Sequence, residues 1–110
     1  MSHSAHPDAA PASVFGALGD PTRLALVARL ARGERHSIST LAGGSALTRQ
    51  AITKHLRVLE TAGLVRNVRH GRESLFELER HRLDDAKLWL DQVSAQWDEA
   101  LERLRRFVEE

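Results

Sequence analysis

The sequence predicts a mostly helical α+β fold in one domain, with about five helices and one two-stranded β-hairpin. Three observations lead to this fold class. Apolar residues recur with a helical period between residues 13 and 62. An alternating pattern typical of a β-hairpin follows, and a last segment of roughly 25 residues contains neither Gly nor Pro. The length of 110 residues fits a single domain, which we place at residues 12–110.

A polar segment precedes the domain at residues 1–11. It is rich in Ala, Ser, His and Pro and has no apolar period, so we expect it to be a disordered tail. The first helix is expected at Ser13–Leu18, where Val14 and Phe15 begin a short apolar face.

A second helix is predicted to start after Gly19. Asp20 is a favourable N-cap, and Pro21 suits the first helical position because the N–H that it lacks has no partner there. Gly33 marks the C-terminal end of this helix. Its apolar stripe comprises Leu24, Val27 and Leu30.

Two further helices follow in close succession. A third, short helix is expected at Ser39–Gly44, and after a turn Thr48 can cap a fourth helix from Arg49 to about Ala62. Gly63 ends the fourth helix. A short helix, a tight turn and a second helix make up the helix-turn-helix unit.

In the next segment apolar and polar residues alternate, as they do in the strands of a β-hairpin. Strands are predicted at Leu64–Val68 and Ser74–Leu78, around a tight turn at His70–Arg72 in which Gly71 permits a positive φ. A hairpin directly after a helix-turn-helix unit is called a wing. The predicted architecture is therefore a winged helix-turn-helix with a long C-terminal helix.

The predicted fourth helix has an apolar face and a polar face. Its apolar stripe comprises Ile52, Leu56 and Leu59, with Ala51 and Val58 alongside. The other face carries no acidic residue before Glu60, and its side chains can hydrogen-bond the base edges or phosphates of a DNA major groove. The residues of this segment that we expect to contact DNA are Thr48, Arg49, Gln50, Thr53, Lys54 and Arg57.

Position along the helix separates the roles of these residues. Side chains near the N-terminal end usually reach base edges, which favours Arg49, Gln50, Thr53 and Lys54 as readers, whereas Arg57 is better placed to hold a phosphate. A solvated amphipathic helix would also expose Arg, Gln and Lys. The absence of acids and the wing that follows favour DNA. His55 is expected to be half-buried and hydrogen-bonded rather than a metal ligand.

The wing is basic near its tip. Arg66, Arg69 and Arg72 surround Gly71, which suits phosphate binding or insertion into a narrow minor groove, and His70 can also touch phosphate. A charged edge strand that keeps the protein soluble is the alternative. From Thr48 to Arg82 eight basic and four acidic residues give a net charge of +4, while residues 83–110 carry −4. We therefore expect one surface to meet a polyanion.

The last segment, Leu83 to about Val108, is predicted to be one helix of roughly 25 residues, about 37 Å long. From Ala86 onward its apolar residues recur in steps of four and three, as in a helix packed lengthwise on another helix. The shorter helices cannot cover this seam, so we expect a second copy to bury it, with Trp97 as the anchor. Packing inside one chain is the alternative, and Trp89, off the seam, is expected to face the protein body. The expected interface residues are Val14, Phe15, Leu90, Val93, Trp97, Leu101, Leu104 and Phe107.

The sequence argues against several other classes of protein. There is no Cys, which removes disulfides, thiolate metal sites and cysteine nucleophiles. No apolar run approaches the roughly 20 residues of a membrane span, and the N-terminus lacks a signal peptide, so we expect a cytoplasmic protein without a membrane partner. Without a Gly-rich phosphate loop or a clustered His/Asp/Glu set, we expect neither an enzyme nor a cofactor.

One group of residues could suggest a nucleophile with its base, namely Ser37, Ser39 and Thr40 beside His36. These hydroxyl residues are better explained as caps of a short helix.

Three stretches of the sequence resemble the ArsR/SmtB-type winged-helix repressors. They are Ala17–Arg23 (ALGDPTR), Leu47–Val65 (LTRQAITKHLRVLETAGLV) and the Gly71-Arg72 wing tip. The resemblance covers about residues 13–108. It implies a homodimer built from the first and last helices, a recognition helix at Thr48–Ala62, binding to an imperfect palindrome in double-stranded DNA, and repression of nearby genes.

The sequence departs from the metal-sensing members of this family. They carry a Cys-Val-Cys element at the start of the third helix, where this chain has Ser37-Ile38-Ser39, and the last helix lacks their paired Asp/His and His/Glu ligands. Carboxylates without imidazole or thiolate make a poor Zn²⁺ site, so the chain resembles a metal-independent subgroup. Two alternatives stay open: a regulator gated by a small-molecule effector, and a winged-helix protein-interaction module that does not bind DNA.

Overall fold

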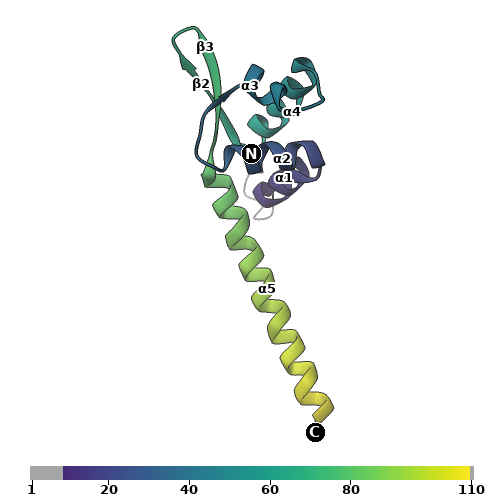
Figure 1. Ribbon diagram of the computed structural model, residues 1–110. Coiled ribbons are helices and arrows are strands. Elements are labelled where there is room, and N and C mark those ends of the chain that lie inside the picture. The colour runs from purple at the N-terminus through teal and green to yellow at the C-terminus, as the bar shows by residue number, and fades with distance from the viewer. Residues whose placement is uncertain (1–8, 110) are drawn as a thin grey trace.

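The structure is a computed structural model that describes residues 9–109 (Figure 1). Within that range five helices and three strands follow one another along the chain. In chain order they are α1 (Ala9–Leu18), α2 (Pro21–Leu30), β1 (His36–Ser37), α3 (Ile38–Gly43), α4 (Arg49–Thr61), β2 (Val65–His70), β3 (Glu73–Leu78) and α5 (Arg80–Glu109). The predicted winged helix-turn-helix is confirmed. No helix between residues 9 and 109 has the length and apolar character that crossing a membrane requires.

α4 lies with its apolar stripe in the core of the protein body. Ile52, Leu56 and Leu59 are at most 1% exposed, as the periodicity predicts. Val58, expected beside them, is 42% exposed, so the buried face of α4 is narrower than its sequence suggests. The helix therefore presents one large apolar side chain to its surroundings.

α2 is rotated relative to the sequence prediction. Leu26, Val27 and Leu30 are buried, whereas Leu24 is exposed. Four large apolar residues within positions 24–30 allow more than one helical stripe, and the packing of α2 against α4 and β3 selects the stripe that includes Leu26.

The C-terminal end of α4 is a Schellman motif. The N–H of Leu64 donates to the carbonyl of Leu59 at 2.9 Å, and the N–H of Gly63 donates to that of Glu60 at 2.9 Å. Gly63 has φ +79°, a left-handed conformation in which an L side chain is strained. The motif turns the chain so that Leu64 and Val65 enter the core and start β2.

The sheet has three antiparallel strands in the order β1-β3-β2. The sequence predicted only two, because a two-residue strand has no alternation to detect. His36 pairs with Phe76 and Ser37 with Leu75, which ties the segment before α3 to the wing. β2 and β3 are longer than predicted and pair as far as His70 and Glu73, leaving Gly71 (φ +63°) and Arg72 as the two-residue turn.

α5 begins at Arg80, before the predicted Leu83, and its 30 residues correspond to a helix about 45 Å long. Its first part packs on α1: Ala86 is buried, and the rings of Phe15 and Trp89 lie 5.7 Å apart. Trp89 thus faces the protein body, as expected. Beyond that contact α5 runs away from the body, toward the side opposite the wing tip (Figure 1).

α1 also begins earlier than predicted. It starts at Ala9 rather than Ser13, so Ala9, Ala10 and Pro11, which were assigned to the tail, are helical. The predicted disorder of residues 1–8 lies outside the described residues. The third helix starts at Ile38, one residue before the expected Ser39, because Ser37 acts as its N-cap.

Gly63→Ala is expected to lower the free energy of unfolding by about 1–2 kcal/mol, because Ala is strained at this positive φ. Its Cβ would also lie 3.0 Å from Cγ of Arg82. Gly43→Ala is the matched control, since Gly43 is helical and has open space around its Cβ position. Urea denaturation should show no loss for Gly43→Ala; equal effects of the two changes would contradict this account of the α4 end.

Candidate nucleic-acid interface

The polar face of α4 is exposed along the helix. Arg49, Gln50, Lys54 and Arg57 are all exposed, and within residues 9–109 their side chains make no hydrogen bond or ion pair. Thr48 caps the helix, its Oγ1 accepting from the N–H of Ala51 at 3.1 Å. The first turn contains no acidic residue, so the positive end of the helix dipole is not neutralised. This face can accept an anion or a polar base edge.

Thr53 differs from its neighbours. Its hydroxyl donates to the carbonyl of Arg49 at 2.7 Å, and the side chain is half-buried. The hydroxyl hydrogen is therefore engaged, while the oxygen can still accept a hydrogen bond and the methyl group can contact an apolar edge. The predicted role of Thr53 as a base reader is restricted to these two kinds of contact.

The tip of the wing carries further cations. Arg69, His70 and Arg72 are exposed on either side of the turn, with Glu73 directly opposite His70. Neither arginine has an ion-pair partner within the described part of the chain. The tip thus has two available guanidinium groups on a projecting ribbon (Figure 1).

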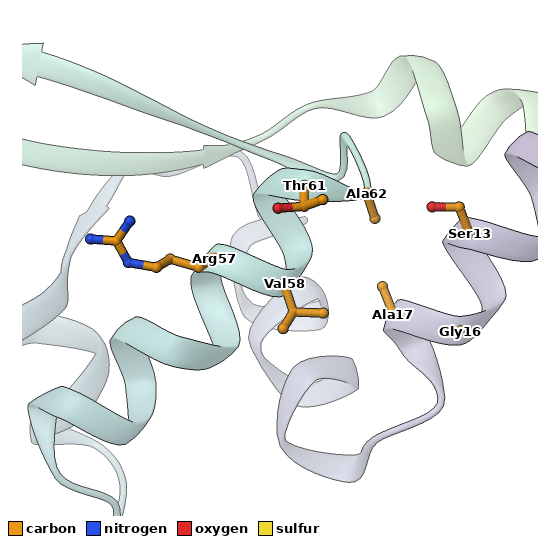
Figure 2. Close-up of a pocket in the computed structure, with 7 residues that line it drawn as sticks. All are labelled: Ser13, Gly16, Ala17, Arg57, Val58, Thr61 and Ala62. Atoms are coloured by element: carbon orange, nitrogen blue, oxygen red, sulfur yellow. The ribbon is translucent and has the colours of Figure 1, made fainter.

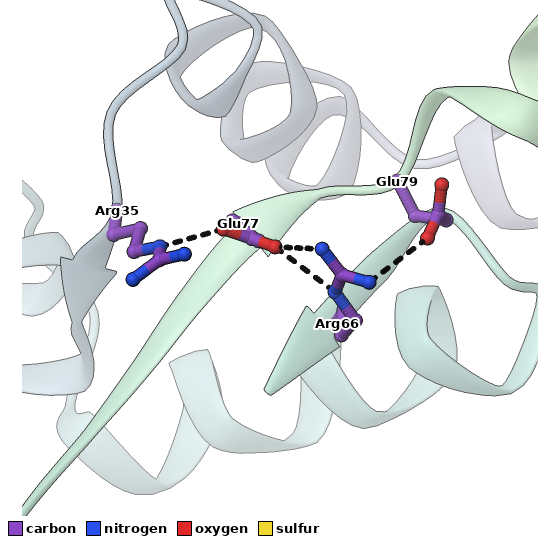
Figure 3. Close-up of polar contacts among 4 residues, drawn as sticks. All are labelled: Arg35, Arg66, Glu77 and Glu79. Carbon is purple, nitrogen blue, oxygen red and sulfur yellow. Dashed lines mark hydrogen bonds and ion pairs between the residues drawn. The ribbon is translucent and has the colours of Figure 1, made fainter. Parts of the chain in front are cut away.

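Arg66 lies at the base of the wing and is already paired (Figure 3). Its Nε donates to Glu77 Oε2 at 2.9 Å, its Nη2 contacts the same oxygen, and its Nη1 lies 3.7 Å from Glu79. Arg35 donates to the other oxygen of Glu77 at 2.7 Å. The hydrogen bonds from Arg66 and then Arg35 hold the pKa of Glu77 below its usual range. The prediction that Arg66 lies at the tip with the other two arginines was therefore wrong: its charge fixes the strands.

A polar contact links α1, α2 and α4. The carboxylate of Asp20 caps α2, accepting from the N–H groups of Thr22 at 2.9 Å and Arg23 at 3.0 Å. Arg23 donates from Nε to the carbonyl of Ala17 at 2.7 Å, and its Nη1 lies 3.4 Å from Nδ1 of His55. Nδ1 of His55 is also 3.9 Å from Asp20. His55 is half-buried and hydrogen-bonded as expected, and it holds α4 against the start of α2.

The same contacts act on the ionisation of Asp20. The hydrogen bond from the backbone of Arg23 is the main reason why the pKa of Asp20 is lower than usual, and the charges of His55 and Arg23 act in the same direction. The sequence showed Asp20 only as a cap. Its contact with α4 depends on residues more than 30 positions apart, which no local pattern reveals.

The predicted interface residues divide between the core and the surface. Val14 is 1% exposed and belongs to the core of its own chain, and Phe15 is half-buried against Trp89, so α1 offers less free apolar surface than expected. Ala86, at the start of the predicted seam, is buried in the same way. The other predicted members are exposed along α5: Leu90, Val93, Trp97, Leu101, Leu104 and Phe107.

The region around β1 does not form a catalytic group. Ser37 Oγ accepts from the N–H of Thr40 at 3.1 Å and donates to its hydroxyl at 3.0 Å, so it caps α3 as predicted. Nε2 of His36 faces Glu34 at 3.4 Å, rather than a serine. Between residues 9 and 109 no three His, Asp or Glu side chains come together as a metal-binding group.

Comparison with known proteins identifies relatives of this chain. A model described as a helix-turn-helix domain matches residues 18–68. The chain is 35% identical over 91 residues to the HTH-type transcriptional regulator Rv2034 of Mycobacterium tuberculosis, covering 83% of this chain and 81% of that protein. It is 32% identical over 92 residues to the HTH-type transcriptional repressor SmtB of that species, covering 84% of this chain and 66% of the repressor. A solved ArsR-like transcriptional regulator from Rhodococcus sp. RHA1 has 37% identity and a TM-score of 0.81, with 90% of this chain and 92% of that chain covered.

The fold and these likenesses define a winged helix-turn-helix transcriptional regulator. The chain belongs to the ArsR family of such regulators. This is a family of transcriptional regulators and not of enzymes, in agreement with the sequence analysis.

Asp20→Asn should lower stability at neutral pH but not in acid. The pKa of Asp20 is lower in the folded protein than in the unfolded chain, so its ionisation stabilises the fold above the unfolded value of about 3.9. That contribution is lost as the pH falls through the folded-state pKa, whereas Asn is an equally good N-cap.

Urea denaturation of both proteins between pH 3 and pH 7 tests this. The difference in unfolding free energy should be constant above about pH 5 and shrink below about pH 4. A difference that is independent of pH would contradict the role assigned to the charge of Asp20.

Proposed function

We propose that this chain is a homodimeric, metal-independent repressor that binds a two-fold symmetric site in double-stranded DNA. The observation that carries the proposal is the unpaired polar face of α4, free of acids through its first three turns, beside a wing tip with two available arginines. A major groove about 12 Å wide admits such a helix. The family membership of the chain supports the same function.

The proposed readers of base edges are Arg49, Gln50, Thr53 and Lys54, and Thr48 and His70 add contacts at the edge of the interface. Gln50 is the sharpest candidate, because an exposed amide can bond adenine in a bidentate manner. Arg57, one turn further along α4, and Arg69 and Arg72 on the wing are assigned to phosphates or the minor groove.

The proposed dimer follows from the exposed apolar stripe of α5. Trp97 is 64% exposed and Phe107 77%, on a helix that continues well beyond the protein body. Such a stripe is unfavourable in water unless a partner covers it, and a two-fold related copy does so symmetrically. Two α4 helices about 34–36 Å apart would then enter successive major grooves.

Metal independence is supported by the donor set. The whole chain contains no Cys, and Ser37-Ile38-Ser39 offers only hydroxyl oxygens where metal-sensing members have thiolates. We therefore assign control of DNA binding to something other than a metal ion, and a small-molecule effector fits that role.

The proposed function is tested by selecting genomic DNA fragments with the wild-type protein and with Gln50→Ala, both at about 150 mM salt, where non-specific binding is weak. The wild type should enrich a two-fold symmetric sequence. Gln50→Ala should bind it about 1–3 kcal/mol more weakly and with relaxed preference at one base pair in each half-site. No enriched sequence for the wild type would favour a protein-interaction module instead, and an unchanged preference would remove Gln50 as a reader.

Arg72→Ala should weaken binding to specific and unrelated DNA alike and lower the slope of log K against log salt by about 1, because a phosphate contact is lost. Arg66→Ala is the matched control, since the charge of Arg66 is already paired with Glu77. Titrations at several salt concentrations should show little change in slope for the control. A loss confined to the specific site would contradict the phosphate role of Arg72.

A further inference from the structure

An open apolar groove lies between α1 and the C-terminal half of α4 (Figure 2). It has a volume of about 380 Å³ and is lined by Ser13, Gly16, Ala17, Arg57, Val58, Thr61 and Ala62. Figure 2 shows Val58 and Ala17 on its facing walls, while the guanidinium of Arg57 points away from it. The groove therefore offers an apolar surface directly behind the proposed phosphate contact.

Ala17 and Ala62 in this groove belong to the core, whereas Val58 is not covered by its own chain. Val58 and Leu24 are the exposed large hydrophobic side chains of the described residues outside α5, and only Val58 lines the groove. On α5, every residue from Asp91 to Glu109 is exposed except the half-buried Ala100. The molecule thus leaves two apolar surfaces uncovered, a groove on the body and the end of a long helix.

One symmetric arrangement, an antiparallel pair of α5 helices, would bring these two surfaces to the same level. In an antiparallel pair of α5 helices with its two-fold axis beside Ala95, Val93 lies opposite Trp97 and Leu90 opposite Ala100. Each large side chain then meets a smaller one, which allows close packing. Leu104 and Phe107 lie about 14 Å and 18 Å from the axis at 1.5 Å per residue.

In such a pair the end of α5 would reach the body of the partner. By the same symmetry Leu104 of one copy lies level with Ala86 of the other, and Phe107 with Leu83. Ala86 is buried where α5 packs on α1, and Leu83 is packed against the core of its own chain. The end of the second helix would therefore come alongside α1, which forms one wall of the groove.

We propose that in the dimer residues 101–109 of α5 from one copy occupy the α1–α4 groove of the other. This inference rests on the proposed homodimer and specifies what its outer contacts are. Leu104, Phe107 and Val108 supply apolar surface to a groove whose own exposed apolar residue is Val58. Each copy then braces the recognition helix of its partner, so that assembly and the placement of the DNA-reading face are coupled.

The absence of Cys from the chain allows a direct test by disulfide trapping. Thr61→Cys, on the groove wall, is mixed with a second protein that carries Val108→Cys. A disulfide requires Cα atoms about 4.4–6.8 Å apart, so it forms only if the two segments meet. Glu102→Cys, on the side of α5 opposite the apolar stripe, is the matched control. Sedimentation equilibrium of the reduced proteins measures dimer formation independently of the disulfide.

The expected result is a cross-linked heterodimer of Thr61→Cys with Val108→Cys and at least several-fold less with Glu102→Cys. Dimeric protein without this excess would overturn the groove contact and leave the homodimer standing, whereas monomeric protein at micromolar concentration would overturn both. In a second measurement Val58→Glu should raise the dimer dissociation constant roughly tenfold or more. Leu24→Glu, at a residue that is also exposed but lies outside the groove, should not. Equal effects of these two changes would contradict the proposal.

Discussion

The rest of the structure depends on the burial of three side chains of α4. Ile52, Leu56 and Leu59 are packed in the core, and this fixes the rotation of the helix about its own axis. Once that rotation is set, Arg49, Gln50, Lys54 and Arg57 must point outward. The orientation of this polar face is therefore set by apolar packing, so its polar residues can be exchanged while the fold is kept.

The wing is placed by contacts that start at the end of the same helix. Gly63 reverses the chain direction in a Schellman motif, and Leu64 and Val65 carry the strand into the core before it leaves toward the tip. Glu77, held between Arg66 and Arg35, then joins the two long strands to the short β1 strand (Figure 3). At the base of the wing the charged side chains are paired with one another, whereas Arg69 and Arg72 at the tip have no ion-pair partner within the described residues.

α5 has two different parts. Its first part completes the core through Ala86 and the Phe15–Trp89 contact, whereas the remainder carries apolar side chains that the chain itself does not cover. A single copy is thus folded but has an unfavourable exposed surface. This surface is the basis of the proposed dimer and of the proposed docking of the helix end in the α1–α4 groove, which would connect assembly to α4 through Val58.

The sequence by itself determined the order of the helices and the two long strands, the caps at Asp20, Thr48 and Gly63, and the polar face of α4, because these depend on neighbours within one or two helical turns. It also located the wing turn at Gly71. Only the tertiary structure decided that Leu24 and Val58 are exposed, that Arg66 is paired and that His36 lies in a strand. Each of these depends on contacts between segments distant in the sequence, and several apolar or charged residues at suitable spacing left the choice open. Packing in three dimensions makes that choice, because only one rotation of each helix fills the core.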